Sequence, residues 1–598
     1  MCGIIAYVGA KSAKEEILNG LKVLEYRGYD SAGLCCFDKG EFNVIKKKGK
    51  VDILTDACKN KLEDTHCGIG HTRWATHGNP SDKNSHPFLS YNKNVAIVHN
   101  GIIENFEKLK DELEKQGVHF ASDTDSEVIA QLLGKSKSES ELKKIQELSQ
   151  QLVGSYAIAI LFKDLENQIF AIRKNSPLIV GKSESGFYLS SDVNALVSKA
   201  EEYYVMQENE IIWINQNKCN CYDDNLNEKS TKFEKMNISQ LDINRGVFEH
   251  FMLKEIMQVP NAIKMTIEEY GHSVNPLTKL PKNMLKKVKH ISIIGCGTAY
   301  NAGLTASHYA RSRGMLVDCY YASEFRYQNF IKRPDEICIF ISQSGETADT
   351  IEALKIAKEK GIPTLVITNV ATSTINKLAD FVMPTKAGPE IAVASTKAYN
   401  AQITTLYVVI DYIYCIKNKI DFRDCILKEK LHKIVEKLEK YDFEEVGKLA
   451  EIIKEYERIF FIGRGVDYAT SQEASLKLKE ISNIHSESLF AGELKHGTLA
   501  LIDENTFVIV IATQKELLDK TINSIYEIKA RKAKVVLLTQ FNIQCEAVDI
   551  MIKLPCTDQT LMAEISILPL QMLAYRTASL KGLDPDKPRN LAKSVTVE

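Results

Sequence analysis

Residues 288–303 read "VKHISIIGCGTAYNAG", a short apolar run that ends at two glycines and leads into a helical pattern. A second copy, "YERIFFIGRGVDYATS", follows 168 residues later at 456–471. The stretch 336–369 is echoed in the same way at 506–540. Apolar runs that alternate with helices are typical of parallel sheets, and a long internal repeat indicates duplicated units. The repeat therefore predicts two tandem α/β lobes, each with a doubly wound parallel sheet.

The first 210 residues follow a different pattern. Short β-branched and aromatic runs such as "CGIIAYVG" and "GSYAIAILF" alternate with turns, and few helical stretches separate them. This pattern predicts antiparallel sheets covered by helices. A polar, aperiodic stretch then indicates a boundary. The expected division of this multidomain α/β chain is a first domain over 1–217, a linker over 218–245, and lobes over 246–435 and 436–598.

Composition excludes several classes of function. Lys+Arg (76) and Asp+Glu (78) nearly balance over 598 residues, so no global field attracts nucleic acid or an anionic membrane. No apolar run is long enough for a membrane span, and the N-terminus lacks the pattern of a secretory signal. The 14 scattered cysteines are expected to be reduced thiols, and the cytoplasm is the expected compartment.

Two patterns suggest a metal or a cofactor, and neither is complete. One is a cluster that lacks the paired spacing of a zinc site, formed by His66, Cys67, His71 and His77. The other is the turn Gly295-x-Gly297, where Tyr300 stands in place of the third glycine of a dinucleotide fingerprint. We therefore expect no metal and no cofactor.

A polar turn in the first lobe predicts an anion site. The stretch "SQSGETADT" at 342–350 lies between a predicted strand and a predicted helix. Ser342, Gln343, Ser344 and Thr347 gather where the helix begins, and an ordinary helix cap needs only one such side chain. The second lobe has "ATQKELLDK" at the equivalent place, so only one lobe is expected to bind phosphate.

Cys2 at the start of the chain is a candidate nucleophile. Cysteine is small enough for Met1 to be removed, which would leave the thiol and a free α-amine on one residue. Such an amine can serve as the base for its own nucleophile.

Longer motifs carry a resemblance to a known family. "MCGI", "LEYRGYDSAG", "HTRWATHG", "VHNGIIEN" and "SDTDSE" are similar to an N-terminal-nucleophile glutamine amidotransferase domain, which is an αββα sandwich. "SQSGETADT", "VASTKA", "LKLKEIS", "AGELKHG" and "PRNLAKSVTVE" resemble paired sugar-isomerase (SIS) domains. In this order the whole chain resembles the glutamine–fructose-6-phosphate aminotransferase family. The resemblance implies that fructose 6-phosphate and glutamine give glucosamine 6-phosphate and glutamate.

In the first domain, the resemblance implies that Cys2 attacks the glutamine amide while Asn100 and Gly101 form the oxyanion hole. The motifs favour Asp125 over Asp123 as the partner of the substrate α-ammonium. Trp74 is implied as a gate toward the second site. The implied glutamine-binding residues are Arg73, Trp74, Thr76, His77 and Asp125.

In the lobes, His496 is implied as the ring-opening residue, lent by the partner subunit of a homodimer. Glu480 is implied as the base of the proton shift, and Lys593 as the amine that condenses with the sugar ketone. The implied sugar-phosphate residues are Gly297, Thr298, Ser342, Gln343, Ser344, Thr347, Val393, Ala394, Ser395 and Lys477. The sequence departs from the family at Ala299, where relatives often carry serine, and at Thr498, where proline is usual.

Two alternatives remain open on the sequence. The amidotransferase half could pass ammonia to a different sugar-phosphate acceptor, and paired isomerase-type lobes also serve as sugar-phosphate sensors. Retention of Cys2, Glu480, His496 and Lys593 argues against a sensor.

Overall fold

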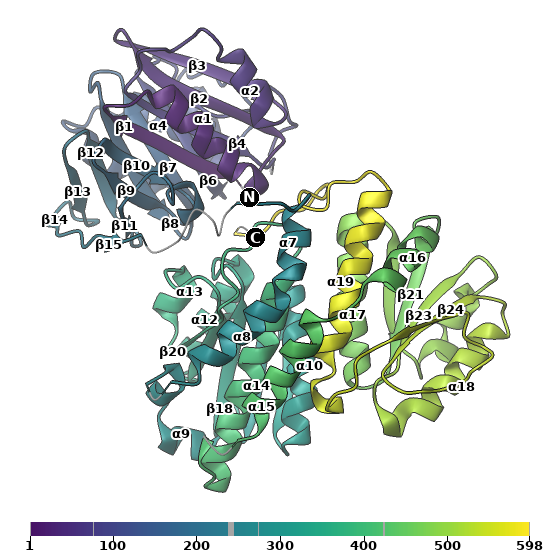
Figure 1. Ribbon diagram of the computed structural model, residues 1–598. Coiled ribbons are helices and arrows are strands. Elements are labelled where there is room, and N and C mark those ends of the chain that lie inside the picture. Colours follow the sequence, from purple (N-terminus) through teal and green to yellow (C-terminus); the bar gives the residue numbers. More distant parts are fainter. Residues whose placement is uncertain (1, 76, 237–243, 273, 423–424, 597–598) are drawn as a thin grey trace. The chain divides into compact units, whose positions relative to one another are not determined.

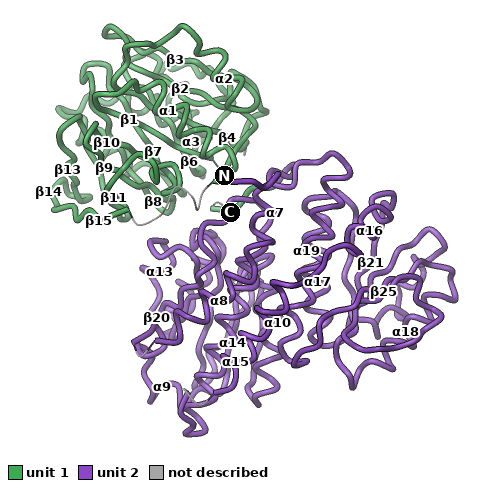
Figure 2. The backbone as a smooth tube through the Cα atoms, viewed as in Figure 1, with its two compact units in different colours: residues 1–244, 592–598 green, residues 245–591 purple. Residues whose placement is uncertain are grey.

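The computed structural model describes residues 2–75, 77–236, 244–272, 274–422 and 425–596. The chain forms two compact units, one of residues 1–244 with 592–598 and one of residues 245–591 (Figure 2). No helix within the described ranges combines the length and the apolar character that crossing a bilayer requires.

The first unit contains two large sheets whose strand pairs are antiparallel (Figure 1). In spatial order, one sheet has strands β15 (Glu234–Lys235), β11 (Glu202–Val205), β9 (Ile179–Ser183), β10 (Gly186–Ser190), β1 (Gly3–Gly9), β4 (Cys67–Arg73), β2 (Ser31–Asp38) and β3 (Glu41–Lys48). The other has β14 (Glu228–Lys229), β13 (Cys219–Tyr222), β12 (Ile211–Asn215), β8 (Gln168–Lys174), β7 (Gly154–Phe162), β6 (Val95–Ile103) and β5 (Phe88–Leu89).

Alternating side chains of the central strands build three apolar layers in this unit. Ile4 and Ala6 of β1 face Val98 of β6 in the layer between the sheets, whereas Ile5 and Tyr7 point the other way, toward helices. The α-helices among the described residues of this unit are α1 (Ala13–Leu24), α2 (Val51–Ala57), α3 (Phe106–Lys115), α4 (Glu127–Lys135) and α5 (Glu141–Gln151). Helices α1 and α2 cover the first sheet, and α4 and α5 cover the second. The expected αββα sandwich is confirmed.

The expected linker over 218–245 is wrong for its first part. Strand β13 pairs with β12, β14 pairs with β13, and β15 pairs with β11, so residues up to 235 extend the two sheets at their edges. Short, polar edge strands bury few side chains and therefore lack apolar alternation. The two units divide between residues 244 and 245.

The second unit contains two five-stranded parallel sheets with the same strand order (Figure 1). The first has β17 (Leu316–Tyr321), β16 (His290–Gly295), β18 (Glu336–Ser342), β19 (Thr364–Thr368) and β20 (Phe381–Pro384). The second has β22 (His485–Phe490), β21 (Arg458–Gly463), β23 (Phe507–Ile511), β24 (Lys534–Thr539) and β25 (Ile550–Lys553). Matched order and parallel pairing confirm the two lobes that the internal repeat predicts.

Thirteen α-helices of the described residues surround these sheets. They are α7 (Phe251–Met257), α8 (Val259–Glu269), α9 (Lys282–Lys287), α10 (Thr298–Ser312), α11 (Ala322–Phe325), α12 (Ala348–Glu359), α13 (Thr374–Leu378), α14 (Lys397–Asn418), α15 (Leu427–Glu439), α16 (Glu444–Ile453), α17 (Val466–Ser482), α18 (Leu518–Lys529) and α19 (Ala563–Leu580). The expected lobe boundary between residues 435 and 436 falls inside α15, whose apolar face packs on α8 and α19. This helix therefore connects the lobes rather than dividing them.

The lobes meet through long helices, and one hydrophobic cluster runs through both. Helix α10 of the first lobe contacts α17 of the second. Between α14 and α19, the fully buried carboxylate of Glu564 accepts hydrogen bonds from Asn400 Nδ2 (2.7 Å) and Thr404 Oγ1 (2.8 Å). Burial raises the pKa of Glu564 to about 8. The lobes thus share polar groups as well as an apolar core.

Candidate active sites

Cys2 lies immediately before β1, beside the end of β4. The antiparallel register pairs Gly3 with Thr72, which brings Cys2 next to the turn at Trp74. The backbone N–H of Trp74 donates to Cys2 Sγ at 3.3 Å, and the thiol lies 3.6 Å from the Trp74 carbonyl oxygen. Burial raises the pKa of the Cys2 thiol. The thiol therefore needs a nearby base to become a nucleophile at neutral pH.

Asn100 lies beside Cys2 at a fixed orientation, and Gly101 follows it in β6. The Asn100 side-chain Nδ2 donates to the Cys2 carbonyl oxygen at 3.0 Å, while Asn100 Oδ1 faces His71 Nε2 at 3.0 Å. Burial lowers the pKa of His71 to about 3, so the ring is neutral at pH 7 and Nε2 donates to both Asn100 and the His99 carbonyl oxygen (2.9 Å). His71 therefore holds the amide N–H of Asn100 toward the cysteine.

Gly101 requires the backbone freedom of glycine. Its φ of +131° lies in a region that side chains disfavour, and an added Cβ would lie 1.9 Å from the carbonyl oxygen of Ser155. The N–H of Gly101, next to Asn100 in β6, is suited to stabilising an oxyanion.

Arg73 and Asp125 offer a buried cation and a buried anion in the same unit. Arg73 Nη2 donates to the carbonyl oxygens of His77 and Gly78, the latter at 3.0 Å. The buried Nη1 of Arg73 has no hydrogen-bond partner within the described ranges. Asp125 Oδ2 accepts from the Ile103 N–H at 2.9 Å, and Asp125 Oδ1 lies 4.0 Å from His77 Nδ1. Because Nη1 has no such partner, this edge of the Arg73 guanidinium can bind a carboxylate.

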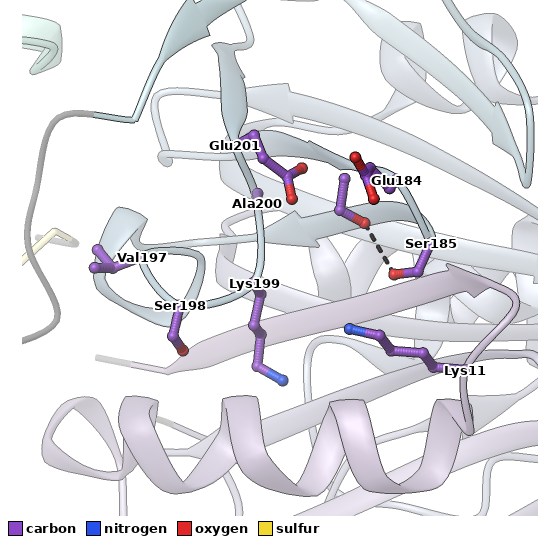
Figure 3. Close-up of a pocket in the computed structure, with 9 residues that line it drawn as sticks. Lys11, Glu184, Ser185, Val197, Ser198, Lys199, Ala200 and Glu201 are labelled. Atoms are coloured by element: carbon purple, nitrogen blue, oxygen red, sulfur yellow. Dashed lines mark hydrogen bonds between the residues drawn. The ribbon is translucent and has the colours of Figure 1, made fainter.

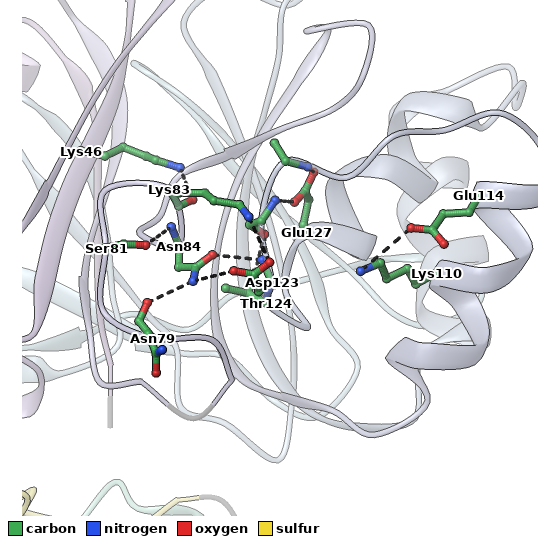
Figure 4. A network of polar contacts seen from close by, with 12 residues as sticks. Lys46, Asn79, Ser81, Lys83, Asn84, Lys110, Glu114, Asp123, Thr124 and Glu127 are labelled. Atoms are coloured by element: carbon green, nitrogen blue, oxygen red, sulfur yellow. Dashed lines mark hydrogen bonds and ion pairs between the residues drawn. The ribbon is translucent and has the colours of Figure 1, made fainter.

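The competing residue Asp123 has a different environment. Its carboxylate accepts from Lys83 Nζ (3.0 Å) and Asn84 Nδ2 (3.2 Å), as Figure 4 shows, and its side chain is largely exposed. It is therefore already paired at the surface, whereas Asp125 is buried. Trp74 is half-buried and packs edge-on against Tyr29 with ring centroids 5.4 Å apart. Thr76, also predicted as a glutamine-binding residue, lies outside the described residues.

A polar cavity of about 410 Å³ lies elsewhere in the first unit (Figure 3). It is lined by Lys11, Lys199, Glu184, Glu201 and neighbouring serines. None of the predicted glutamine-binding residues that the structure describes lines it.

The predicted anion site of the first lobe lies at the carboxyl end of β18. Ser342 Oγ accepts from the Gly345 N–H at 3.0 Å and lies 3.0 Å from Thr347 Oγ1, while Ser344 Oγ accepts from the Glu346 N–H at 3.2 Å. These bonds fold residues 342–347 into a compact turn before α12. Because β16 and β18 are adjacent and parallel, the turn lies at the same sheet edge as the start of α10. Ligands of open α/β sheets bind at such an edge.

Gly297 and Thr298 form the start of α10, and residues 393–395 precede α14. Gly297 has a φ of +53°, which favours glycine. Val393 and Ala394 are buried, and the Val393 N–H donates to the Asp586 carbonyl oxygen at 3.1 Å. Gln343 and Ser395 are half-buried.

Lys477 is the centre of a buried charge network between the lobes. Its Nζ lies 2.6 Å from Glu480, 3.5 Å from Glu473 and 3.0 Å from the hydroxyl of Thr298. Burial lowers the pKa of Lys477, but Glu480 and Glu473 outweigh this and raise it. Lys477 is therefore a cation although it is 1% exposed. The network brings Thr298 of one lobe to Lys477 and Glu480 of the other.

Glu473 is a member of this network that the sequence did not reveal. Its carboxylate accepts from Thr298 Oγ1 (3.0 Å) and Asn301 Nδ2 (2.8 Å). Burial raises its pKa to about 7, although Lys477 opposes the shift. The spacing of four residues between Glu473 and Lys477 on α17 was the available signal.

The remaining predicted residues of the lobes are His496 and Lys593. His496 lies in a short 3-10 helix (Leu494–His496) and is exposed, and no hydrogen bond or ion pair links its side chain to Lys477 or Glu480 in the described part of the chain. Lys593 belongs to the segment 592–598, which is part of the first unit.

The chain is similar to known proteins along its whole length. Family models match a glutamine amidotransferase domain over residues 71–198 and a SIS domain over residues 284–411 and 451–581. Proteins named glutamine–fructose-6-phosphate aminotransferase (isomerizing) from Caldanaerobacter subterraneus subsp. tengcongensis and Aquifex aeolicus are 43% and 40% identical, each over 100% of both chains.

A solved structure gives a further comparison. The C-terminal domain of glucosamine-fructose-6-phosphate aminotransferase from Francisella tularensis is 34% identical, covers 57% of this chain and 99% of that one, and superposes with a TM-score of 0.54. The full-length similarity to curated relatives, together with both domain types, assigns this chain to the glutamine–fructose-6-phosphate aminotransferase family.

Proposed function

We propose that this protein transfers the amide nitrogen of glutamine to fructose 6-phosphate and forms glucosamine 6-phosphate and glutamate, the first step of amino-sugar synthesis. The arrangement of Asn100 beside Cys2, with His71 holding the Asn100 amide and Gly101 next in β6, carries this proposal. It brings a nucleophile next to β1 of one sheet beside an oxyanion site on β6 of the other, and amide hydrolysis needs both groups.

In the first step, Cys2 attacks the side-chain carbonyl carbon of glutamine. Removal of Met1 frees the α-amine of Cys2, which takes the thiol proton and returns it to the leaving nitrogen, so that ammonia departs. Water then cleaves the thioester to glutamate and regenerates the thiol. We assign the free Nη1 edge of Arg73 to the substrate carboxylate, and Asp125 to its ammonium group.

In the second step, ammonia reacts with the sugar in the other unit. We assign the turn of residues 342–347, the start of α10 and residues 393–395 to the phosphate and the sugar. The Lys593 amine would condense with the ketone at C2, forming an imine and releasing water. Ammonia would then add at C2, and the Lys593 amine would leave. Glu480 would move the proton between C1 and C2, held in place by Lys477 at 2.6 Å.

His496 is exposed, so we propose that it acts in the partner subunit's site of a homodimer. We further propose a cytoplasmic enzyme that uses no metal or cofactor. Trp74 would separate the glutamine site from the ammonia path, which fits its half-buried position next to Cys2.

The test is a reaction with amide-¹⁵N glutamine and fructose 6-phosphate. We expect one ¹⁵N-labelled glucosamine 6-phosphate for each glutamate. Cys2→Ala should lose both products from glutamine, whereas the control Cys556→Ala, at an exposed cysteine, should keep them. Glutamate without glucosamine 6-phosphate would refute the proposal and point to another acceptor. Binding of fructose 6-phosphate without any turnover would point to a sensor.

A further inference from the structure

The two lobes begin their first helices with the same backbone geometry. Gly297 precedes α10 with φ 53° and ψ −125°, and Gly465 precedes α17 with φ 59° and ψ −128°. In each lobe the second residue of the helix packs against the glycine that ends the preceding strand. A Cβ added to Gly295 would contact Ala299, and a Cβ added to Gly463 would contact Asp467. Ala299 and Asp467 therefore occupy equivalent positions.

Aromatic pairs confirm this equivalence one residue further along. Tyr300 stacks on Tyr321 with ring centroids 3.7 Å apart and an interplanar angle of 18°. Tyr468 stacks on Phe490 with centroids 3.5 Å apart and an angle of 22°. The turns of the two lobes thus correspond residue by residue.

The neighbouring strands extend the correspondence to the loops that follow them. Ile291 of β16 pairs with Ile337 of β18, and Ile459 of β21 pairs with Phe507 of β23. Counting from these pairs, Thr513 is the counterpart of Gln343. The loop after β23 is therefore the counterpart of the serine-rich turn at residues 342–347.

Asp467 is bonded to that counterpart loop. Its side chain is 3% exposed, and its carboxylate accepts the Thr513 backbone N–H at 2.8 Å and also the Thr513 hydroxyl. Burial raises the pKa of Asp467 to about 6, and hydrogen bonds from Thr513 and the Gln514 backbone oppose the rise. The carboxylate also lies in the first turn of α17, where the helix dipole favours a negative charge.

We infer that Asp467 fills an anion site in the second lobe, with its carboxylate standing where the first lobe would hold the phosphate of its substrate. The assignment of the 342–347 turn to phosphate rests on the proposed function. Ala299 leaves the first site open, because alanine has no side chain that could reach the loop. Asp467 makes the second site unavailable. Its carboxylate already accepts the N–H and the hydroxyl of Thr513, and its negative charge repels another anion. Each chain then binds one sugar phosphate although it carries two homologous lobes.

Reciprocal substitutions test this inference by titration calorimetry of the full-length protein. Asp467→Ala gives the second lobe the residue of the first, and we expect it to bind one more inorganic phosphate per chain than the wild type. Asp467→Asn keeps the volume of the side chain and should bind no additional phosphate. Ala299→Asp should weaken phosphate binding to the first lobe by at least about a hundredfold, because it places a like charge in the site.

The second variant Asp467→Ser, also small and uncharged, provides the same test if Asp467→Ala does not fold. A folded variant of either kind that binds no additional phosphate overturns the inference, and so does full phosphate affinity in Ala299→Asp. A different calorimetry result would show that the proposed function fails while the inference about Asp467 holds. A wild type that binds no phosphate, with an Asp467→Ala variant that binds one, would refute the first-lobe assignment and still support the inference about Asp467.

Discussion

Replacing Glu564 with glutamine should stabilise the second unit, and the gain should increase with pH. Glu564 is fully buried between α14 and α19, and its pKa is raised by burial from an ordinary 4.5 to about 8. A glutamine side chain keeps an oxygen for Thr404. Its N–H takes the place of the oxygen that accepts from Asn400 Nδ2, so the Asn400 amide must turn over and present Oδ1, a buried oxygen with no hydrogen-bond partner among the described residues. The variant therefore removes a titrating group and keeps the shape.

The sign of the effect follows from the raised pKa. The protonated carboxyl favours the folded state, so its contribution to stability is complete below pH 4.5 and is lost as the pH rises to about 8. Between about pH 5 and about pH 8, the wild type should lose about 3.5 kcal/mol that the variant keeps. With an unfolding entropy of about 2.1 cal/mol/K per residue over about 350 residues, this corresponds to about 5 °C in Tm.

Differential scanning calorimetry at several pH values measures this difference. Glu455→Gln is a matched control, because the Glu455 side chain is 75% exposed and its replacement should shift Tm by a small amount that does not depend on pH. A Tm difference between Glu564→Gln and the wild type that stays constant from pH 5 to pH 8 would show that Glu564 does not titrate in this range. The argument from burial would then be refuted.

Four substitutions in the first unit should separate its chemical steps. Cys2→Ala should abolish glutamine hydrolysis and leave fructose 6-phosphate binding measurable by calorimetry; loss of both in a folded protein would contradict separate sites. Asn100→Ala should lower kcat for glutamine hydrolysis by about 10²–10³ with little change in KM, because an oxyanion donor acts in the transition state. Arg73→Lys should raise KM for glutamine by about tenfold or more, since lysine lacks the planar fork; an unchanged KM would exclude a carboxylate contact. Trp74→Ala should keep glutaminase activity and release free ammonia, so equal losses of glutaminase and synthase rates would exclude a gate.

The sequence predicted the fold where apolar patterns were long, and missed details that depend on edges and on distant partners. The internal repeat predicted both parallel sheets, because fully buried strands produce continuous apolar runs. Strands β13 to β15 were missed because they lie at sheet edges, where most of their side chains are exposed or half-buried and no apolar pattern appears in the sequence. The expected boundary between residues 435 and 436 falls inside α15, which packs on α8 and α19.

In the candidate sites, the sequence predicted only the residues that belong to a recognisable motif. Asn100 could be named from its motif, but the role of His71 follows from the strand register that brings it to Asn100 Oδ1. In the sequence His71 belonged to an incomplete metal-like cluster. Glu473 was missed because its donors, Thr298 and Asn301, lie more than 170 residues earlier, on a helix of the other lobe.

The contact between the lobes also shows how far the two repeats have diverged. Both buried carboxylates, Glu473 and Glu564, come from the second lobe, while the amides and hydroxyls that bind them come from the first. A second copy of the first lobe would bring no carboxylate to these amides and hydroxyls, and a second copy of the second lobe would bring none of these donors to Glu473 and Glu564. The two repeats are therefore no longer interchangeable at this contact, because one supplies the carboxylates and the other supplies the amides and hydroxyls that bind them.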